Sequence, residues 1–162
     1  MAKSNIDKIS LDVAPLTLHI GAEIKNVDLR KPLSDQHVEN IKATLAKWKV
    51  LFFRDQFIDH DQHVAFSRQL GNPTPGHPIY GARAGYPEIY TVSKTRMTDR
   101  FEGEPINHPW NWWHTDLTCA KNPPYASILR ADVVPLYGGD TQFTNLCAAY
   151  DALSPAMQSF VE

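Results

Sequence analysis

Cysteines and long apolar runs are both scarce in this sequence, and the two shortages narrow the class of protein. There are 2 cysteines among 162 residues, Cys119 and Cys147, which form neither a disulfide framework nor a CxxC metal motif. We expect both to be small packing residues in a reducing cytosol. No run of about 18 apolar residues occurs, and the polar N-terminus lacks the apolar core of a signal peptide. The sequence therefore predicts a cytoplasmic protein with no membrane partner.

A strong excess of charge is also missing. Lys and Arg number 16 against 18 Asp and Glu, the formal net charge is -2, and the pI is near 6.4. Because the basic residues are scattered, no positive field exists to attract nucleic acid, although a local pocket can still bind a small anion. With 43% hydrophobic and 21% charged residues, the chain should form one globular domain or part of one.

A histidine and an aspartate stand two residues apart near the middle of the chain, in Trp112-Trp113-His114-Thr115-Asp116. In an extended strand such residues project to the same face, so both side chains can reach one ion. They supply two of the three ligands of the 2-His-1-carboxylate triad, which holds non-haem Fe(II) and leaves positions open for a co-substrate and dioxygen. The pair thus favours an iron oxygenase. The alternative is a core imidazole hydrogen-bonded to a nearby carboxylate.

Short stretches of alternating or β-branched residues predict strands. The stretch that ends at Gly21 alternates apolar and polar residues, and the run beginning at Val50 combines β-branched and aromatic residues as buried strands do. The expected strands cover residues 16–21 with a continuation to 27, 50–53, 88–93, a stretch opening at 114, 126–131 and 140–144. Short strands joined by glycine turns around a ligand pair favour a mainly β jelly roll with flanking helices over a parallel α/β sheet.

Three helices are expected from apolar periodicity and capping residues. The first spans residues 34–48 with Ser34 as N-cap, and the second follows a capping box of Asp59 with Gln62 and ends before Gly71. The third spans residues 147–162 and restarts at Ser154-Pro155 as N-cap and first helical residue. Between these elements, residues 71–87 are rich in Pro and Gly and predict a long ordered loop, whereas residues 94–111 predict a lid or a disordered excursion.

Six motifs in order give the sequence a family resemblance. They are Ile20-Gly21-Ala22-Glu23, Val50-Leu51-Phe52-Phe53-Arg54-Asp55-Gln56, Gly76-His77-Pro78, Trp113-His114-Thr115-Asp116, Ala126-Ser127-Ile128-Leu129-Arg130 and Gly138-Gly139-Asp140-Thr141. From about Leu16 onward the chain resembles the taurine dioxygenase family. Those Fe(II)- and 2-oxoglutarate-dependent enzymes include alkylsulfatases and aryloxyalkanoate dioxygenases.

The resemblance implies the ligands of the iron and of the co-substrate. His114 and Asp116 match the proximal iron ligands, and Thr141 matches the threonine whose hydroxyl meets a carboxylate of 2-oxoglutarate. A hydroxyl donates to an anion without adding charge beside the metal, although Thr141 can equally be an ordinary strand threonine. Fe(II), 2-oxoglutarate and dioxygen are therefore the implied cofactor and co-substrates.

The resemblance also implies a substrate pocket. His77 and Tyr80 match a substrate-pocket stretch whose donors can meet a sulfonate, sulfate or carboxylate; the alternative is a loop histidine and a packed tyrosine. Leu117 takes the place of a pocket-wall valine. Trp110 stands where taurine dioxygenase proper has an asparagine, which removes an acceptor for the amine of taurine and favours a bulkier or more apolar substrate. Alternatively, Trp110 and Trp112 only pack the lid.

Two family residues have no counterpart here. No histidine follows His114, and Arg130, the one arginine after Asp116, does not match the arginine that pairs the far carboxylate of 2-oxoglutarate. A jelly roll that ended at Glu162 would leave open strand edges. We therefore expect residues 1–162 to be the N-terminal part of a single jelly-roll domain whose C-terminal part is absent from this chain.

The function that the resemblance implies belongs to that complete protein. It is a dioxygenase that hydroxylates a small anionic substrate (a sulfonate, an alkyl sulfate or an aryloxy acid) and releases succinate and CO2. Homo-oligomers are compatible with this function. The alternative is a non-catalytic, metal-binding cupin-like module, if the truncation is natural.

Overall fold

The computed structural model describes residues 10–77, 81–92 and 112–162. Two compact units make up the chain: unit 1 comprises Met1–Leu70 and Ala131–Glu162, and unit 2 comprises Gly71–Arg130. All helices and strands of the described residues belong to unit 1. Within the same residues, no helix has the length and apolar character needed to cross a bilayer.

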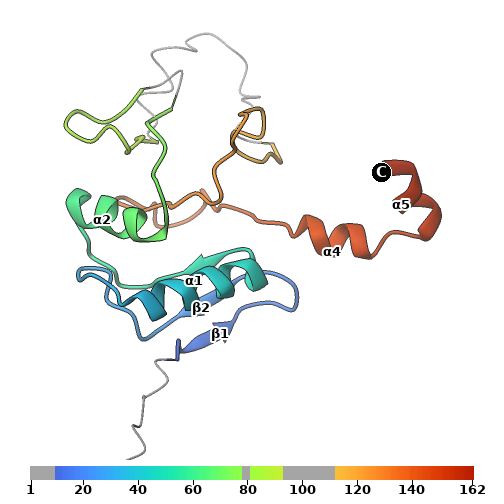
Figure 1. Ribbon diagram of the computed structural model, residues 1–162, viewed down its shortest axis with the longest axis horizontal. Coiled ribbons are helices and arrows are strands. Elements are labelled where there is room, and N and C mark those ends of the chain that lie inside the picture. Colours follow the sequence, from blue (N-terminus) through green and yellow to red (C-terminus); the bar gives the residue numbers. More distant parts are fainter. Residues whose placement is uncertain (1–9, 78–80, 93–111) are drawn as a thin grey trace, which may run out of the picture. The chain divides into compact units, whose positions relative to one another are not determined.

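A small open sheet forms one part of unit 1 (Figure 1). Its strands are β1 (Val13–Pro15), β2 (Ala22–Ile24) and β3 (Leu51–Phe52), in the order β1-β2-β3. β1 pairs antiparallel with β2, and β2 pairs parallel with β3. The expected strand near residue 50 is confirmed, although its side chains are only half-buried.

The strand expected over residues 16–21 is wrong, because these residues connect β1 to β2. Leu16 N donates to Gly21 O at 2.9 Å, and Gly21 adopts a φ of 86° that closes the connection. Leu18 is 82% exposed, so the alternation does not mark a buried face. The expected continuation is confirmed as a strand at residues 22–24.

Helices α1 (Asp35–Trp48) and α2 (His60–Leu70) confirm both predicted N-terminal caps. The Ser34 side chain accepts from His37 N at the start of α1. Before α2, Gln62 N donates to Asp59 Oδ1 at 2.8 Å and Asp59 N donates to Gln62 Oε1 at 2.9 Å. Two terminal donors are thereby satisfied reciprocally.

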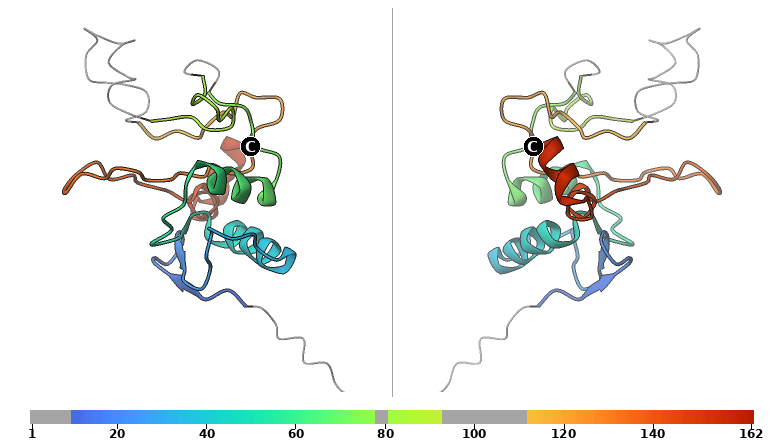
Figure 2. Two further views of the ribbon diagram at one scale, coloured as in Figure 1. Left: turned by 90° about the vertical axis from the view of Figure 1, so that its left-hand side faces the viewer. Right: turned by 90° about the vertical axis from the view of Figure 1, so that its right-hand side faces the viewer.

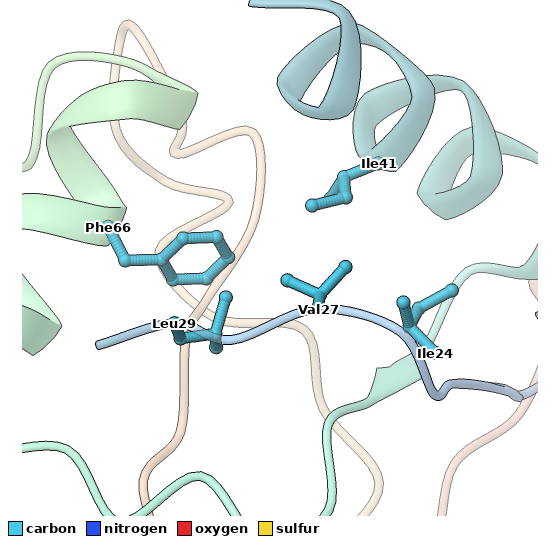
Figure 3. Close-up of a cluster of buried hydrophobic side chains, with 5 residues drawn as sticks. All are labelled: Ile24, Val27, Leu29, Ile41 and Phe66. Atoms are coloured by element: carbon cyan, nitrogen blue, oxygen red, sulfur yellow. The ribbon is translucent and has the colours of Figure 1, made fainter. Parts of the chain in front are cut away.

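The core of unit 1 lies between these helices and the segment that follows β2. Figure 3 shows Ile41 of α1 pointing toward Val27, and Phe66 of α2 lying beside Leu29, with Ile24 at the end of the cluster. All five side chains are buried. The burial of these apolar side chains stabilises the packing of α1 and α2 against β2 and the segment that follows it.

The end of the chain is helical, as the sequence predicts. α4 (Leu146–Asp151) is capped by Asn145, and α5 (Pro155–Val161) begins with Ser154 as N-cap and proline in its first turn. The interruption between the helices therefore follows from local capping chemistry.

Several predicted strands do not form. Residues 88–92, 114–116, 126–131 and 140–144 have no strand structure, so the described chain is a mixture of helices and a small sheet rather than mainly β. A strand requires a neighbouring strand for its backbone hydrogen bonds, and no neighbour pairs with these stretches among the described residues. The packing role expected for Cys119 and Cys147 is also wrong, because both are exposed.

Candidate functional site

His114 and Asp116 are brought together in unit 2. The distance between His114 Nε2 and Asp116 Oδ1 is 3.3 Å, and the two side chains are 50% and 62% exposed. Residues 113–115 are irregular and a turn begins at Asp116. The two side chains therefore meet through the local course of the chain and not through the alternation of a strand.

A hydrogen bond fixes the orientation of the imidazole. His114 Nδ1 lies 2.7 Å from the carbonyl oxygen of Trp112. A carbonyl can only accept, so Nδ1 carries the proton and donates. Nε2 is then the atom that faces the carboxylate, at 3.3 Å from Asp116 Oδ1, and its lone pair is available to accept a bond. A ligating histidine that donates its other N–H to a carbonyl is the usual arrangement in metal sites.

The turn after the pair is strained. Leu117 has a φ of 51°, a left-handed conformation that costs a non-glycine residue roughly 1–2 kcal/mol. Ala120 N donates to Leu117 O at 3.0 Å and closes the turn. Leu117 is half-buried.

His77 lies in a tight loop of unit 2. Gly76 N donates to Pro87 O at 2.6 Å, and Gly81 N donates to His77 O at 2.7 Å. A Cβ at Gly76 would stand 2.7 Å from the Cβ of Ala82, so the loop can close only with glycine there. The imidazole of His77 lies 5.1 Å, centroid to centroid, from the ring of Tyr90.

Thr141 belongs to unit 1, in an irregular and exposed segment. Gly138 and Gly139 precede it, and each has a φ of 73°. Phe143 and Asn145 follow it, and both contact the N-terminal part of unit 1. The structure thus joins His114 with Asp116, while Thr141 belongs to a different unit.

Tyr80, Trp110 and the segment 94–111 lie outside the described residues. Across residues 10–77, 81–92 and 112–162, no group of three or more His, Cys, Asp or Glu is arranged to hold a metal ion. The described part of the chain therefore offers a pair of ligands.

Two contacts at these segments were not predicted from the sequence. An asparagine directly before a helix is a good N-cap, so the capping role of Asn145 was readable from the sequence. The partner of its amide, His19 O, is 126 positions away, and no local pattern points to it. The bond from His114 to the Trp112 carbonyl also depends on a backbone turn that spacing does not specify.

The pair places an imidazole nitrogen and a carboxylate oxygen 3.3 Å apart, and both are atom types that bind metal ions in proteins. Over residues 12–162 the sequence matches the family described as "Taurine catabolism dioxygenase TauD, TfdA family". The chain belongs to this family, which confirms the resemblance carried by its motifs.

Two curated relatives and one crystal structure illustrate the match. The alpha-ketoglutarate-dependent sulfate ester dioxygenase of Pseudomonas putida is 36% identical over 155 residues, which cover 95% of this chain and 48% of that protein. The alpha-ketoglutarate-dependent 2,4-dichlorophenoxyacetate dioxygenase of Cupriavidus pinatubonensis is 33% identical over 163 residues, covering 95% and 56%. The crystal structure of a taurine dioxygenase from Burkholderia xenovorans is 50% identical with a TM-score of 0.80, covering 94% of this chain and 51% of that one. The chain thus spans about half the length of these relatives.

Proposed function

We propose that the whole protein is an Fe(II)- and 2-oxoglutarate-dependent dioxygenase. The observation that carries the proposal is the pairing of His114 Nε2 with Asp116 Oδ1 at 3.3 Å, with Nδ1 held by the Trp112 carbonyl. The names of the two curated relatives described above both contain alpha-ketoglutarate, which is another name for 2-oxoglutarate.

The donor pair fits Fe(II). Adjacent ligands of an octahedral ion with bonds of about 2.1 Å stand roughly 3 Å apart, so a separation of 3.3 Å requires only a small adjustment. An imidazole nitrogen and a carboxylate oxygen are two of the donors of the facial triad. When bound, iron with 2-oxoglutarate and dioxygen supplies the oxidising chemistry that hydroxylates a C–H bond and yields succinate and CO2. His114 and Asp116 would hold the ion, and the hydrogen bond to Trp112 O would keep the imidazole in the ligating tautomer.

The proposed substrate is a small organic anion. The two curated relatives act on a sulfate ester and on 2,4-dichlorophenoxyacetate, as their names state. We assign His77 and Tyr80 to the anionic head of the substrate, where charge-assisted donors are strongest. We assign Trp110 and Leu117 to its apolar part. An alkyl sulfate, a longer sulfonate or an aryloxy acid suits this set better than taurine does.

We also propose that residues 1–162 form the N-terminal part of one jelly-roll domain. An arm of unit 1 between Ala131 and α4 runs out from its helices and sheet and back again (Figure 2). Its apolar side chains Val133, Leu136 and Tyr137 are 91%, 102% and 89% exposed. Soluble proteins rarely leave such a cluster in water, and strands of the remaining half of a jelly roll would cover it and pair with its backbone.

The role of Thr141 can be tested by Thr141→Val in the whole protein. Loss of one hydroxyl-to-carboxylate hydrogen bond should cost about 1.5 to 3 kcal/mol, so the apparent constant for 2-oxoglutarate should rise roughly ten- to a hundredfold. The constant for the primary substrate should hardly change. Steady-state kinetics with 2-oxoglutarate as the varied reactant measures both.

Thr144→Val is the matched control, because Thr144 is exposed in the same segment. It should leave both constants unchanged. An unaltered 2-oxoglutarate constant in Thr141→Val would show that Thr141 has only a structural role.

A further inference from the structure

We propose that Asn145 is a positioning residue for the co-substrate, because its side chain ties the segment that carries Thr141 to the N-terminal part of unit 1. The inference rests on the proposed role of Thr141 in binding 2-oxoglutarate. It assigns to Asn145 an effect on the affinity for that dianion, in addition to its capping of α4.

The side-chain amide of Asn145 makes one hydrogen bond through its oxygen and one through its nitrogen. Its Oδ1 accepts from Ala148 N at 3.1 Å and caps α4, while its Nδ2 donates to His19 O at 2.7 Å. His19 lies in the connection between β1 and β2. One side chain therefore joins the start of α4 to a segment 126 positions earlier in the sequence.

A second contact supports the same segment two residues earlier. The ring of Phe143 meets that of Phe52 of β3 edge to face, with centroids 6.4 Å apart and an interplanar angle of 80°. Edge-to-face pairs at this distance are attractive. The segment after Thr141 is consequently held at two points, by a ring contact to β3 and by a hydrogen bond to the connection between β1 and β2.

The chain on the N-terminal side of Thr141 contains two glycines in the left-handed backbone conformation. Gly138 and Gly139 both have a φ of 73°, a region that glycine enters freely. The arm that they belong to is exposed at Val133 and Leu136. Of the contacts described around Thr141, that of Phe143 connects its segment to β3, and that of Asn145 connects it to the segment between β1 and β2.

The position of the Thr141 hydroxyl thus depends on the two contacts that follow it in the sequence, those of Phe143 and Asn145. A hydrogen bond weakens steeply when its angle or distance departs from the optimum, and a misplacement of about 1 Å can cost as much as roughly a hundredfold in a binding or catalytic step. Removing the hydrogen bond from Asn145 Nδ2 to His19 O should therefore weaken 2-oxoglutarate binding. This effect requires no direct contact between Asn145 and the co-substrate.

Asn145→Asp in the whole protein isolates the effect of the hydrogen bond to His19 O. The carboxylate keeps an acceptor for Ala148 N, so α4 stays capped, but it has no donor for His19 O. We expect the dissociation constant of 2-oxoglutarate, measured by calorimetry, to rise about tenfold. The turnover number and the constant for the primary substrate should stay within about twofold, which a general loss of folding would not produce. Hydrogen exchange should become faster in residues 140–145.

Asn26→Asp is the matched control. Asn26 makes the same two-sided contact elsewhere in unit 1: Nδ2 donates to Ser10 O at 3.0 Å and Oδ1 accepts from Asp12 N at 2.7 Å. The variant should show a similar change in melting temperature and no change in the 2-oxoglutarate constant. If it weakens 2-oxoglutarate as much as Asn145→Asp does, the effect is general destabilisation and the inference fails.

Thr141→Val separates the inference from the proposed function. If Thr141→Val raises the 2-oxoglutarate constant and Asn145→Asp does not, Asn145 has no positioning role. If Thr141→Val has no effect, the proposed role of Thr141 fails first. When both single variants weaken binding, the double variant should bind no more weakly than Thr141→Val, because Asn145 acts through the Thr141 hydroxyl. Additive losses would overturn the inference.

Should Asn145→Asp fail to fold, Phe143→Leu removes the ring contact with Phe52 and should give the same selective rise in the 2-oxoglutarate constant.

Discussion

His114→Ala in the whole protein should abolish Fe(II) binding and turnover while the fold survives. The imidazole supplies one of the two ligands that unit 2 brings together, and no third His, Cys, Asp or Glu joins them among the described residues. Loss of one of these two proposed ligands should therefore lower the affinity for the ion below the level at which it stays bound. Metal analysis after anaerobic loading gives the stoichiometry, and circular dichroism reports the fold.

His19→Ala is a suitable control, because this exposed histidine uses its backbone carbonyl in the contact with Asn145. It should retain one equivalent of Fe(II). Asp116→Glu is a finer test, since the additional methylene moves the carboxylate by about an ångström and should lower activity more than stability. Retention of iron by His114→Ala would contradict the assignment of the pair.

His77→Ala should weaken the binding of anionic substrates by about 2 to 3 kcal/mol, the cost of losing a charge-assisted hydrogen bond. This corresponds to a rise of roughly 30- to 150-fold in the substrate constant. Substrate-independent decarboxylation of 2-oxoglutarate should continue, because His77 takes no part in the proposed binding of iron or co-substrate. Succinate formation, measured with and without substrate, separates the two effects.

The control for His77→Ala is a change of ligand and not a second protein variant. A neutral analogue that lacks the sulfate or carboxylate head should bind the wild type and His77→Ala equally well. If the variant loses the same factor with both ligands, the histidine shapes the loop around Tyr90 and does not bind the anion.

The helix ends were predictable because their chemistry is local. The cap of α1 and the capping box of α2 involve residues three positions apart, and Ser154 caps α5 in the same way. Such contacts depend only on the identity of a few neighbouring residues. The sequence pattern therefore fixes them without knowledge of the tertiary fold.

The strands were harder to predict because each depends on a partner. Residues 126–131 have the alternation of a strand, yet they are irregular since no described segment pairs with them. The stretch at 16–21 has the same alternation but exposes Leu16 and Leu18. Alternation reports that a residue pattern is compatible with a strand, whereas pairing decides whether one forms.

In the candidate site, too, local spacing was informative, whereas contacts with distant residues were not predictable. The spacing of His114 and Asp116 predicted that a strand would project both side chains to one face, whereas the structure places them 3.3 Å apart through an irregular segment and a turn. The tautomer of His114 depends on the Trp112 carbonyl, and the placement of the Thr141 segment depends on His19 and Phe52. Spacing alone specifies neither, because the first depends on a backbone conformation and the second on distant partners.

The most direct test of iron-dependent co-substrate binding is an anaerobic calorimetric titration of Fe(II) into the whole wild-type protein, followed by titration of 2-oxoglutarate with and without the metal. We predict one equivalent of Fe(II) per chain, and 2-oxoglutarate binding that is at least about tenfold tighter once the metal is bound. A protein that binds no Fe(II), or that binds 2-oxoglutarate equally well in the absence of metal, would contradict the assignment of His114, Asp116 and Thr141.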